Sequence, residues 1–292
     1  MNNKMNRRSF LKRMLGGAIS LLGLSGGSYY YAKYMEPSML SVQEEKIISS
    51  NIPPQLEGLR VLQFSDTHLG FHYDITQFER LVHHINKQQC DLLLFTGDLF
   101  DAPNEASFEM LEQAASLLDS ITAPLGKFWI YGNHDHGGYG TDLIATYMEK
   151  GGFTLLQNQH KTLTYNGEEF IVSGLDDVML GKPDISRALP PQAAHTFTML
   201  LCHEPDYVEH IKGEPFDIQL SGHSHGGQIQ IPFLGHMVTP PYAKQYVEGW
   251  HTIRSNQSLY VSRGLGTTRL PYRFLCKPEF TVHTLTAQKQ DG

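Results

Sequence analysis

Short apolar runs bounded by glycine and polar residues recur along the chain and predict buried strands. They occupy residues 59–64, 91–95, 127–131, 198–202 and 216–220. Such runs are too short for helices of ordinary length, and they are typical of strands that are covered on both faces.

Helical patterns lie between the first of these strands. The clearest spans residues 74–88, where apolar side chains recur at positions 78, 81, 82 and 85 and Asp74 can cap the first turn. Residues 105–119 and 141–150 give two further helices. This alternation of strand and helix predicts parallel strands that are joined by helical crossovers.

The second half of the chain is richer in strand patterns. Asn166-Gly167 is a hairpin signal between the strand patterns of residues 163–165 and 170–173. Further short strands are expected near residues 228, 250, 259 and 281. The pattern as a whole predicts a mixed α/β chain.

The N-terminus indicates export. Residues 6–12 match the twin-arginine motif, except that Asn6 stands where Ser or Thr is usual. Residues 14–34 are apolar and glycine-rich, end among tyrosines, and are long enough to span a bilayer at about 1.5 Å per residue. We therefore expect passage through the twin-arginine translocase to the extracytoplasmic face of the membrane, cell wall or periplasm. Cleavage of this segment and its retention as an anchor both stay open.

The chain divides into a leader and one large domain. We expect a signal or anchor at residues 1–35, a polar linker at 36–56, a catalytic domain at 57–286 and a tail at 287–292. The leader has six basic and no acidic residues, so the remainder carries 17 basic against 30 acidic side chains, a net charge of −13. This charge argues against general nucleic-acid binding. The three widely spaced cysteines predict buried free thiols.

Five polar clusters follow the predicted strands, and each offers a carboxylate, an imidazole or an amide oxygen. They lie at residues 66–68, 97–101, 132–135, 202–204 and 222–225. This ligand chemistry suits divalent manganese, iron, cobalt or zinc. Gly97, Gly132 and Gly222 each precede a ligand, where tolerance of positive φ would allow a sharp exit from the strand.

These clusters resemble the calcineurin-like metallophosphoesterase family, whose pattern runs DxH, GDxxD, GNH[DE], a lone His and GHxH. All five blocks are present and in order. The resemblance implies an α/β (α+β) fold, a four-layer αββα sandwich of two mixed β-sheets with flanking helices. It also implies two divalent metal ions (Mn, Fe, Zn or Co), one bound by Asp66, His68, Asp98 and His225 and the other by Asp98, Asn133, His203 and His223.

The resemblance also implies roles for residues beside the ligands. His134 would contact the scissile phosphate, and would either stabilise transition-state charge or protonate the leaving group. Asp135 would orient that imidazole. Asp101 would hydrogen-bond a ligand histidine rather than the metal, or else is an exposed loop acid.

Residues 260–274 resemble the exported YkuE/YaeI-like phosphodiesterase branch of the family. Arg273 and Arg269 in this stretch are candidates for binding substrate oxygens, and a packing or surface role stays open for both. The resemblance implies hydrolysis of a phosphodiester by metal-activated hydroxide. The expected placement outside the membrane favours an envelope substrate (a phospholipid, nucleotide-sugar lipid or wall polymer). The alternatives are a phosphomonoesterase acting on small extracytoplasmic phosphates and a non-catalytic membrane-tethered metal-binding module.

Overall fold

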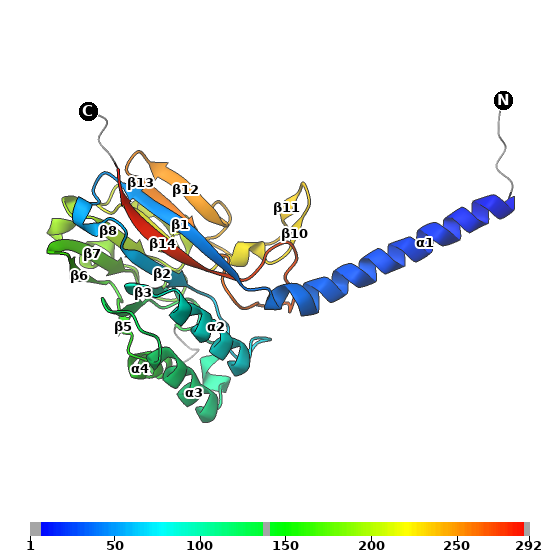
Figure 1. Ribbon diagram of the computed structural model, residues 1–292, viewed down its shortest axis with the longest axis horizontal. Coiled ribbons are helices and arrows are strands. Elements are labelled where there is room, and N and C mark those ends of the chain that lie inside the picture. The colour runs from blue at the N-terminus through cyan, green and yellow to red at the C-terminus, as the bar shows by residue number, and fades with distance from the viewer. Residues whose placement is uncertain (1–6, 137–140, 289–292) are drawn as a thin grey trace.

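Two six-stranded sheets packed face to face form the body of the protein (Figure 1). The structure is a computed structural model that describes residues 7–136 and 141–288. The predicted leader and tail therefore fall partly on residues 1–6 and 289–292, outside the described residues.

The first sheet has the order β1-β14-β2-β3-β4-β5. Strands β2 to β5 are mutually parallel, β14 runs antiparallel to β2, and β1 runs parallel to β14. The bounds are β1 (Ser41–Ser49), β14 (Glu279–Ala287), β2 (Arg60–Phe64), β3 (Leu92–Phe95), β4 (Lys127–Trp129) and β5 (Thr154–Leu155).

The second sheet has the order β12-β13-β9-β8-β7-β6, with four parallel central strands and an antiparallel strand at each edge. The predicted Asn166-Gly167 turn joins β6 to β7, and both of its residues have positive φ. The bounds are β12 (Gly249–Arg254), β13 (Gln257–Val261), β9 (Ile218–Ser221), β8 (Thr198–Leu201), β7 (Glu168–Gly174) and β6 (Gln159–Tyr165).

Helices cover the outer faces of both sheets. Three helices, α2 (Ile75–Lys87), α3 (Phe108–Asp119) and α4 (Thr141–Lys150), pack on the first sheet, and the short α5 (Ile185–Ala188) and α6 (Val208–Ile211) pack on the second. Asp74 caps α2 as predicted, in a reciprocal capping box with Gln77. The predicted fold of two mixed sheets with flanking helices is confirmed.

The central strands are apolar on both faces because each face packs on a different layer. In β3, for example, Leu92 and Leu94 face the second sheet, whereas Leu93 and Phe95 face the helices. A strand buried in this way reads as an unbroken apolar run. The three cysteines are buried and free, also as predicted.

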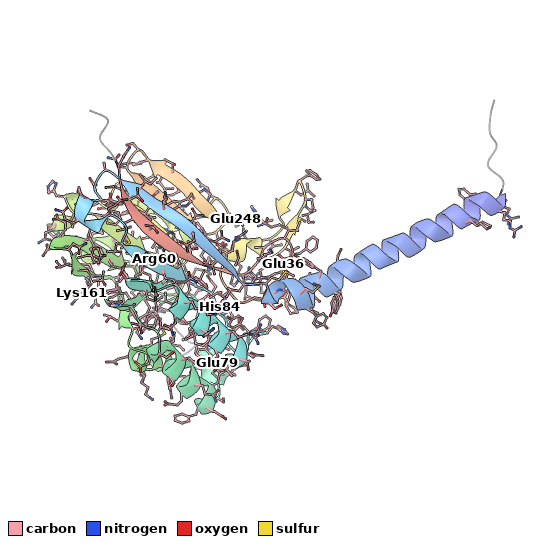
Figure 2. The ribbon with its side chains drawn as sticks, in the orientation of Figure 1. Glu36, Arg60, Glu79, His84, Lys161 and Glu248 are labelled. Carbon is pink, nitrogen blue, oxygen red and sulfur yellow. The ribbon has the colours of Figure 1, made fainter. Side chains whose placement is uncertain are left out.

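The expected linker at residues 36–56 is instead part of the fold. Residues 41–49 form β1, which pairs in parallel with β14 along its whole length. Glu36 is buried at the base of helix α1 (Arg7–Tyr30; Figure 2), where its carboxylate accepts hydrogen bonds from the backbone N–H groups of Leu275 and Cys276. Main-chain pairing, one buried carboxylate and the buried side chains of Ile47, Ile52 and Leu56 attach this segment to the domain.

Helix α1 (Arg7–Tyr30) projects from the domain as a single rod (Figure 1). Among the described residues, no helix combines the length and the apolar character needed to cross a membrane. At its base, the carbonyl of Ala32 accepts a hydrogen bond from the backbone N–H of Arg273.

A histidine buried between the sheets gives a prediction about pH. His283 is fully buried; its Nε2 lies 3.1 Å from Oε1 of Gln63, and its ring packs edge-on against Tyr260. Burial lowers its pKa from 6.5 to about 3. Below pH 6.5 the unfolded chain therefore takes up a proton that the folded chain excludes, so this group destabilises the fold as pH falls toward 3.

We expect His283→Gln, which cannot titrate, to lose less stability on acidification than the wild type. The difference should be about 2 kcal/mol in the free energy of unfolding between pH 7 and pH 5. Urea unfolding of both proteins at the two pH values measures it. Equal losses would mean that His283 accepts a proton in the folded state.

Candidate metal centre

The predicted ligands meet where the carboxyl ends of parallel strands from both sheets converge. Asp66, Asp98 and Asn133 lie beyond the ends of β2, β3 and β4, and His203 and His223 lie beyond the ends of β8 and β9. Because parallel strands end at one edge, ligands that are far apart in the sequence become neighbours. Asp66, His68 and His225 form one group, and Asp98, His203 and His223 form another.

Most of these ligands occupy strained backbone positions. Five of the seven have positive φ, namely Asp66 (54°), His68 (45°), Asp98 (64°), His223 (67°) and His225 (52°). Non-glycine residues seldom adopt this conformation, and it costs roughly 1–3 kcal/mol at each position. The strained backbone therefore lowers the local stability of the loops and sets the direction in which each ligand side chain points.

The expectation of positive φ is confirmed at Gly97 but is wrong for Gly132 and Gly222. Among the three, only Gly97 has positive φ (100°). At Gly132 an added Cβ would lie 2.2 Å from Oδ1 of Asp98, and at Gly222 it would lie 2.3 Å from Oδ2 of Asp66. At these two positions glycine is needed because the backbone passes directly over a ligand carboxylate.

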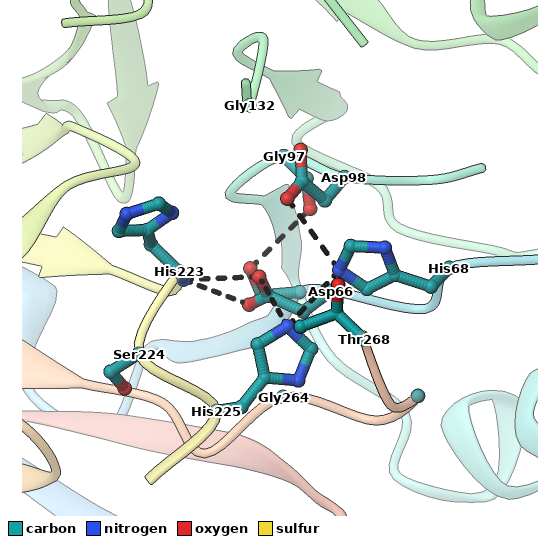
Figure 3. Close-up of polar contacts among 12 residues, drawn as sticks. Asp66, His68, Gly97, Asp98, Gly132, His223, Ser224, His225, Gly264 and Thr268 are labelled. Carbon is teal, nitrogen blue, oxygen red and sulfur yellow. Dashed lines mark hydrogen bonds and ion pairs between the residues drawn. The ribbon is translucent and has the colours of Figure 1, made fainter. Parts of the chain in front are cut away.

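Asp66 and two histidines face one another in the first group (Figure 3). The Nε2 atoms of His68 and His225 lie 3.0 Å apart. That of His225 is 3.5 Å from Oδ1 of Asp66, and that of His68 is 3.5 Å from Oδ2 of Asp98. Two ring nitrogens and two carboxylates thus converge on one small volume.

The second group gathers around Asp98. Nε2 of His203 lies 3.2 Å from Oδ2 of Asp98. The opposite nitrogen of this ring donates to the carbonyl of Thr96 at 2.6 Å, and Nε2 of His223 donates to the carbonyl of Pro241 at 2.8 Å. These bonds fix the tautomers, because a nitrogen that donates leaves the other with a lone pair for a cation.

The two buried carboxylates of the centre, Asp66 and Asp98, favour a positive charge nearby. Burial raises the pKa of Asp66, whereas at Asp98 the nearby His203, His134 and His68 outweigh burial and hold the pKa well below its usual range. Burial opposes protonation of His203, but Asp98 and Asp66 raise its pKa well above the usual value. A proton on His203 therefore occupies the place that a bound cation would take.

Two other ligand histidines, His223 and His225, have the opposite tendency. Burial, reinforced by His203, lowers the pKa of His223 to about 3, and burial together with His68 holds that of His225 well below its usual value. Both rings are thus neutral, as metal ligation requires.

The donor set fits divalent cations. The buried Oδ1 of Asn133 has no hydrogen-bond partner among the described residues, although buried amide oxygens normally have one. Two carboxylates, four imidazoles and this oxygen make a mixed nitrogen and oxygen set, which suits manganese, iron, cobalt or zinc better than magnesium or calcium.

Asp101 and His134 lie at the edge of the centre. Oδ1 of Asp101 is 3.0 Å from Nδ1 of His68, the contact expected for a residue that orients a ligand. Nδ1 of His134 donates to the backbone carbonyl of Asp101 at 2.7 Å, so its Nε2 is the nitrogen that can exchange a proton. Burial disfavours its charged form, but Asp98 and Asp101 raise the pKa of His134 above its usual value.

The expectation that Asp135 orients His134 is wrong. The buried Asp135 carboxylate accepts hydrogen bonds from the backbone N–H groups of Asp98, Leu99 and Gly132. These three donors use both of its oxygens. Asp135 therefore ties together the two loops that carry Asp98 and Asn133, and Asp101 is the residue that positions His134.

The expectation that Arg273 binds substrate is also wrong. Its side chain is fully buried, and its guanidinium donates to the backbone carbonyls of Gly266, Cys276 and Arg263. The five N–H donors of the guanidinium match a loop whose backbone presents several carbonyl acceptors. Arg269, in contrast, is exposed and lines the pocket above the ligands.

A pocket of about 350 Å³ opens above the centre. Its floor includes His68, Asp98, Asn133, His134 and His223. Sequence reasoning missed its apolar wall, which includes Met179, Ile229, Met237, Val238, Pro241 and Leu270. The sequence feature that could have indicated this wall is the absence of Asp, Glu, Lys and Arg from residues 218–243.

Comparisons with known proteins agree with this geometry. The profile of the calcineurin-like phosphoesterase family matches residues 59–227. The chain is 45% identical to the metallophosphoesterase YkuE of Bacillus subtilis, over 97% of this chain and 98% of the relative. It is 27% identical to the phosphodiesterase YaeI of Escherichia coli, over 93% and 97% of the two chains. It is 26% identical to the UDP-2,3-diacylglucosamine pyrophosphatase LpxG of Chlamydia trachomatis, over 87% and 92%.

We expect Asp101→Ala to weaken manganese binding roughly 10- to 100-fold, because His68 loses the acceptor that fixes its tautomer and ring direction. Calorimetric titration of metal-free protein measures the affinity. Asp119→Ala, at an exposed position on α3, is the matched control and should bind like the wild type. Unchanged affinity in Asp101→Ala would show that its contact with His68 does not orient the ligand.

Proposed function

Because the chain belongs to the calcineurin-like phosphoesterase family and is a metal-dependent phosphoester hydrolase, we propose that it is a phosphodiesterase with two metal ions. Its proposed substrate is a phosphodiester of the cell envelope: a phospholipid, a nucleotide-sugar lipid or a wall polymer. The observation that carries this proposal is the arrangement of two ligand groups around Asp98 on the floor of a pocket with an apolar wall.

Two relatives support the diester over the monoester. YaeI is a phosphodiesterase and LpxG is a pyrophosphatase. In the substrates of both, the reacting phosphorus atom carries two groups that are each attached through a bridging oxygen. A diester carries a second organic group that must be accommodated beside the reacting phosphorus. The apolar wall of the pocket, with Met237 and Leu270, offers a surface for such a group.

The ligand sets proposed for the two ions share Asp98. Asp66, His68 and His225 would complete one set, and Asn133, His203 and His223 the other. When bound, the ions supply Lewis acidity toward phosphoryl oxygens and lower the pKa of water toward neutrality. One carboxylate between two cations also reduces their mutual repulsion.

His134 is the proposed acid. Its Nδ1 donates to the carbonyl of Asp101, so Nε2 is the nitrogen proposed to exchange a proton in the pocket that His134 lines. The raised pKa keeps this imidazole charged to a higher pH than an isolated histidine. In that state it can stabilise negative charge on phosphoryl oxygens or protonate the departing alkoxide.

Arg269 is the proposed cationic contact for substrate at the rim of the pocket. In a diester assay we expect Arg269→Ala to raise KM, whereas Arg254→Ala, an exposed arginine at the end of β12, should leave KM unchanged.

Export completes the proposal. The twin-arginine motif at residues 6–12 supports passage of the folded protein through the translocase to the extracytoplasmic side. Fractionation of cells that express Arg7→Lys/Arg8→Lys protein tests it, because the pair of arginines identifies the route. Unchanged export of that variant would contradict this part of the proposal.

We expect the full chain, reloaded with manganese, to hydrolyse bis(p-nitrophenyl) phosphate faster than p-nitrophenyl phosphate. The full chain is the right material, since Ala32 and Glu36 bond to the loop of Arg273 to Cys276. Asp98→Ala should lose both metal binding and hydrolysis. Preferential monoester cleavage would indicate a phosphomonoesterase, and metal binding without cleavage of either compound would indicate a binding module.

We expect His134→Ala to retain manganese and to lose roughly 10²- to 10⁴-fold in kcat, because it removes an acid and not a ligand. His160→Ala, at an exposed position on β6, is the control. Metal affinity and kcat are measured on the same preparations. Turnover at the wild-type rate would rule out the proposed role of His134.

A further inference from the structure

An apolar hairpin stands beside the mouth of the pocket. Strands β10 (Gln230–Ile231) and β11 (Gly235–His236) pair antiparallel and project from the body of the protein (Figure 1). At its tip Phe233 is fully exposed and Leu234 is 74% exposed. Exposure of large apolar side chains to water is unfavourable, and a group of such side chains marks an interaction surface.

The composition of this region disfavours recognition of a partner by ion pairs. Residues 218–243 contain no Asp, Glu, Lys or Arg, in a chain whose net charge is −7. Met237 and Val238, which follow β11, are 57% and 69% exposed. The apolar surface thus continues from the tip of the hairpin along the strand that returns to the domain.

The same surface reaches the metal centre. Ile229, Met237 and Val238 line the pocket whose floor holds His223 and His225. The apolar side chains on both sides of the hairpin therefore form part of the wall of the pocket that holds the ligands. A hairpin that bound only a protein partner would not require an apolar surface that extends to the pocket.

The hairpin also joins the base of α1. Gln230 donates its backbone N–H to the carbonyl of Phe274, whose ring packs edge-on against Tyr31. Tyr30 and Tyr34 are exposed there, with Lys33 over the ring of Tyr34. Tyrosine and lysine side chains are typical of the boundary between a bilayer and water.

We propose that the β10–β11 hairpin docks the protein on a phospholipid bilayer, with Phe233 and Leu234 entering the boundary between headgroups and acyl chains. A stable protein interface needs about 800 Å² from each partner. A narrow tip of two large apolar residues instead has the shape of a wedge, which suits a lipid surface. Docking places the open, apolar side of the pocket against the lipid. Only the passage of a lipid substrate into the pocket rests on the proposed function.

The test is a fluorescent reporter in the full chain. Phe233→Trp is compared with Phe108→Trp, whose position on α3 is also exposed but lies away from the hairpin (Figure 1). Each variant is mixed with vesicles of phosphatidylglycerol and phosphatidylcholine that carry brominated acyl chains. We expect strong quenching of the new tryptophan at position 233 and none at position 108, even if α1 contributes to binding. Quenching at neither position, or at both alike, would overturn the proposal.

A second variant connects docking to hydrolysis. Phe233→Ser/Leu234→Ser should lower cleavage of a phosphodiester lipid embedded in vesicles about tenfold or more, and leave cleavage of soluble bis(p-nitrophenyl) phosphate unchanged. Equal activity of wild type and variant on the embedded lipid would overturn the role of the hairpin in substrate access. If the wild type cleaves neither compound, the proposed function fails, and the quenching result still decides whether the hairpin docks.

Discussion

Two carboxylates buried side by side, Asp66 and Asp98, are the constraint on which the structure of the centre depends. An unpaired buried charge costs several kcal/mol, and two of the same sign also repel each other. The fold answers with backbone donors, since the N–H of His223 reaches Asp66 and that of His134 reaches Asp98. It also surrounds them with imidazoles, and the high pKa of His203 shows that this still leaves room for positive charge. Divalent cations, of which we propose two, would satisfy the same requirement with the ligands that converge there.

Hydrogen bonds within the fold hold the loops in their strained conformations. Asp135 is central to this, because one buried carboxylate binds three backbone N–H groups from two different loops. Gly132 and Gly222 allow the chain to pass over the ligand carboxylates, and the positive φ angles of Asp66 and Asp98 turn their side chains toward each other. A centre arranged in advance loses less freedom when it binds metal.

The sequence predicted the parts of the fold in which apolar pattern and structure coincide. Each run that leads into a ligand forms a strand, because strands that are buried on two faces are predominantly apolar. It could not predict β1, whose nine residues include only Ile47 as a buried side chain and whose partner lies more than 230 residues away. Nor could it predict that Arg273 is buried, since arginine is normally exposed and only the carbonyl groups of a folded loop reverse that preference.

The metal ligands and the apolar wall of the pocket come from different segments, and a hydrogen bond between His223 and Pro241 links them. The ligands belong to the ends of strands, whereas most of the apolar wall, with Ile229, Met237, Val238 and Pro241, belongs to the segment between β9 and β12. Nε2 of His223 donates to the carbonyl of Pro241, so this segment fixes the orientation of a ligand. Because the acceptor is a main-chain atom, side chains of the wall can differ without disturbing that ligand, provided that the backbone keeps its course. The same metal chemistry can therefore serve different substrates through changes confined to the wall and the hairpin.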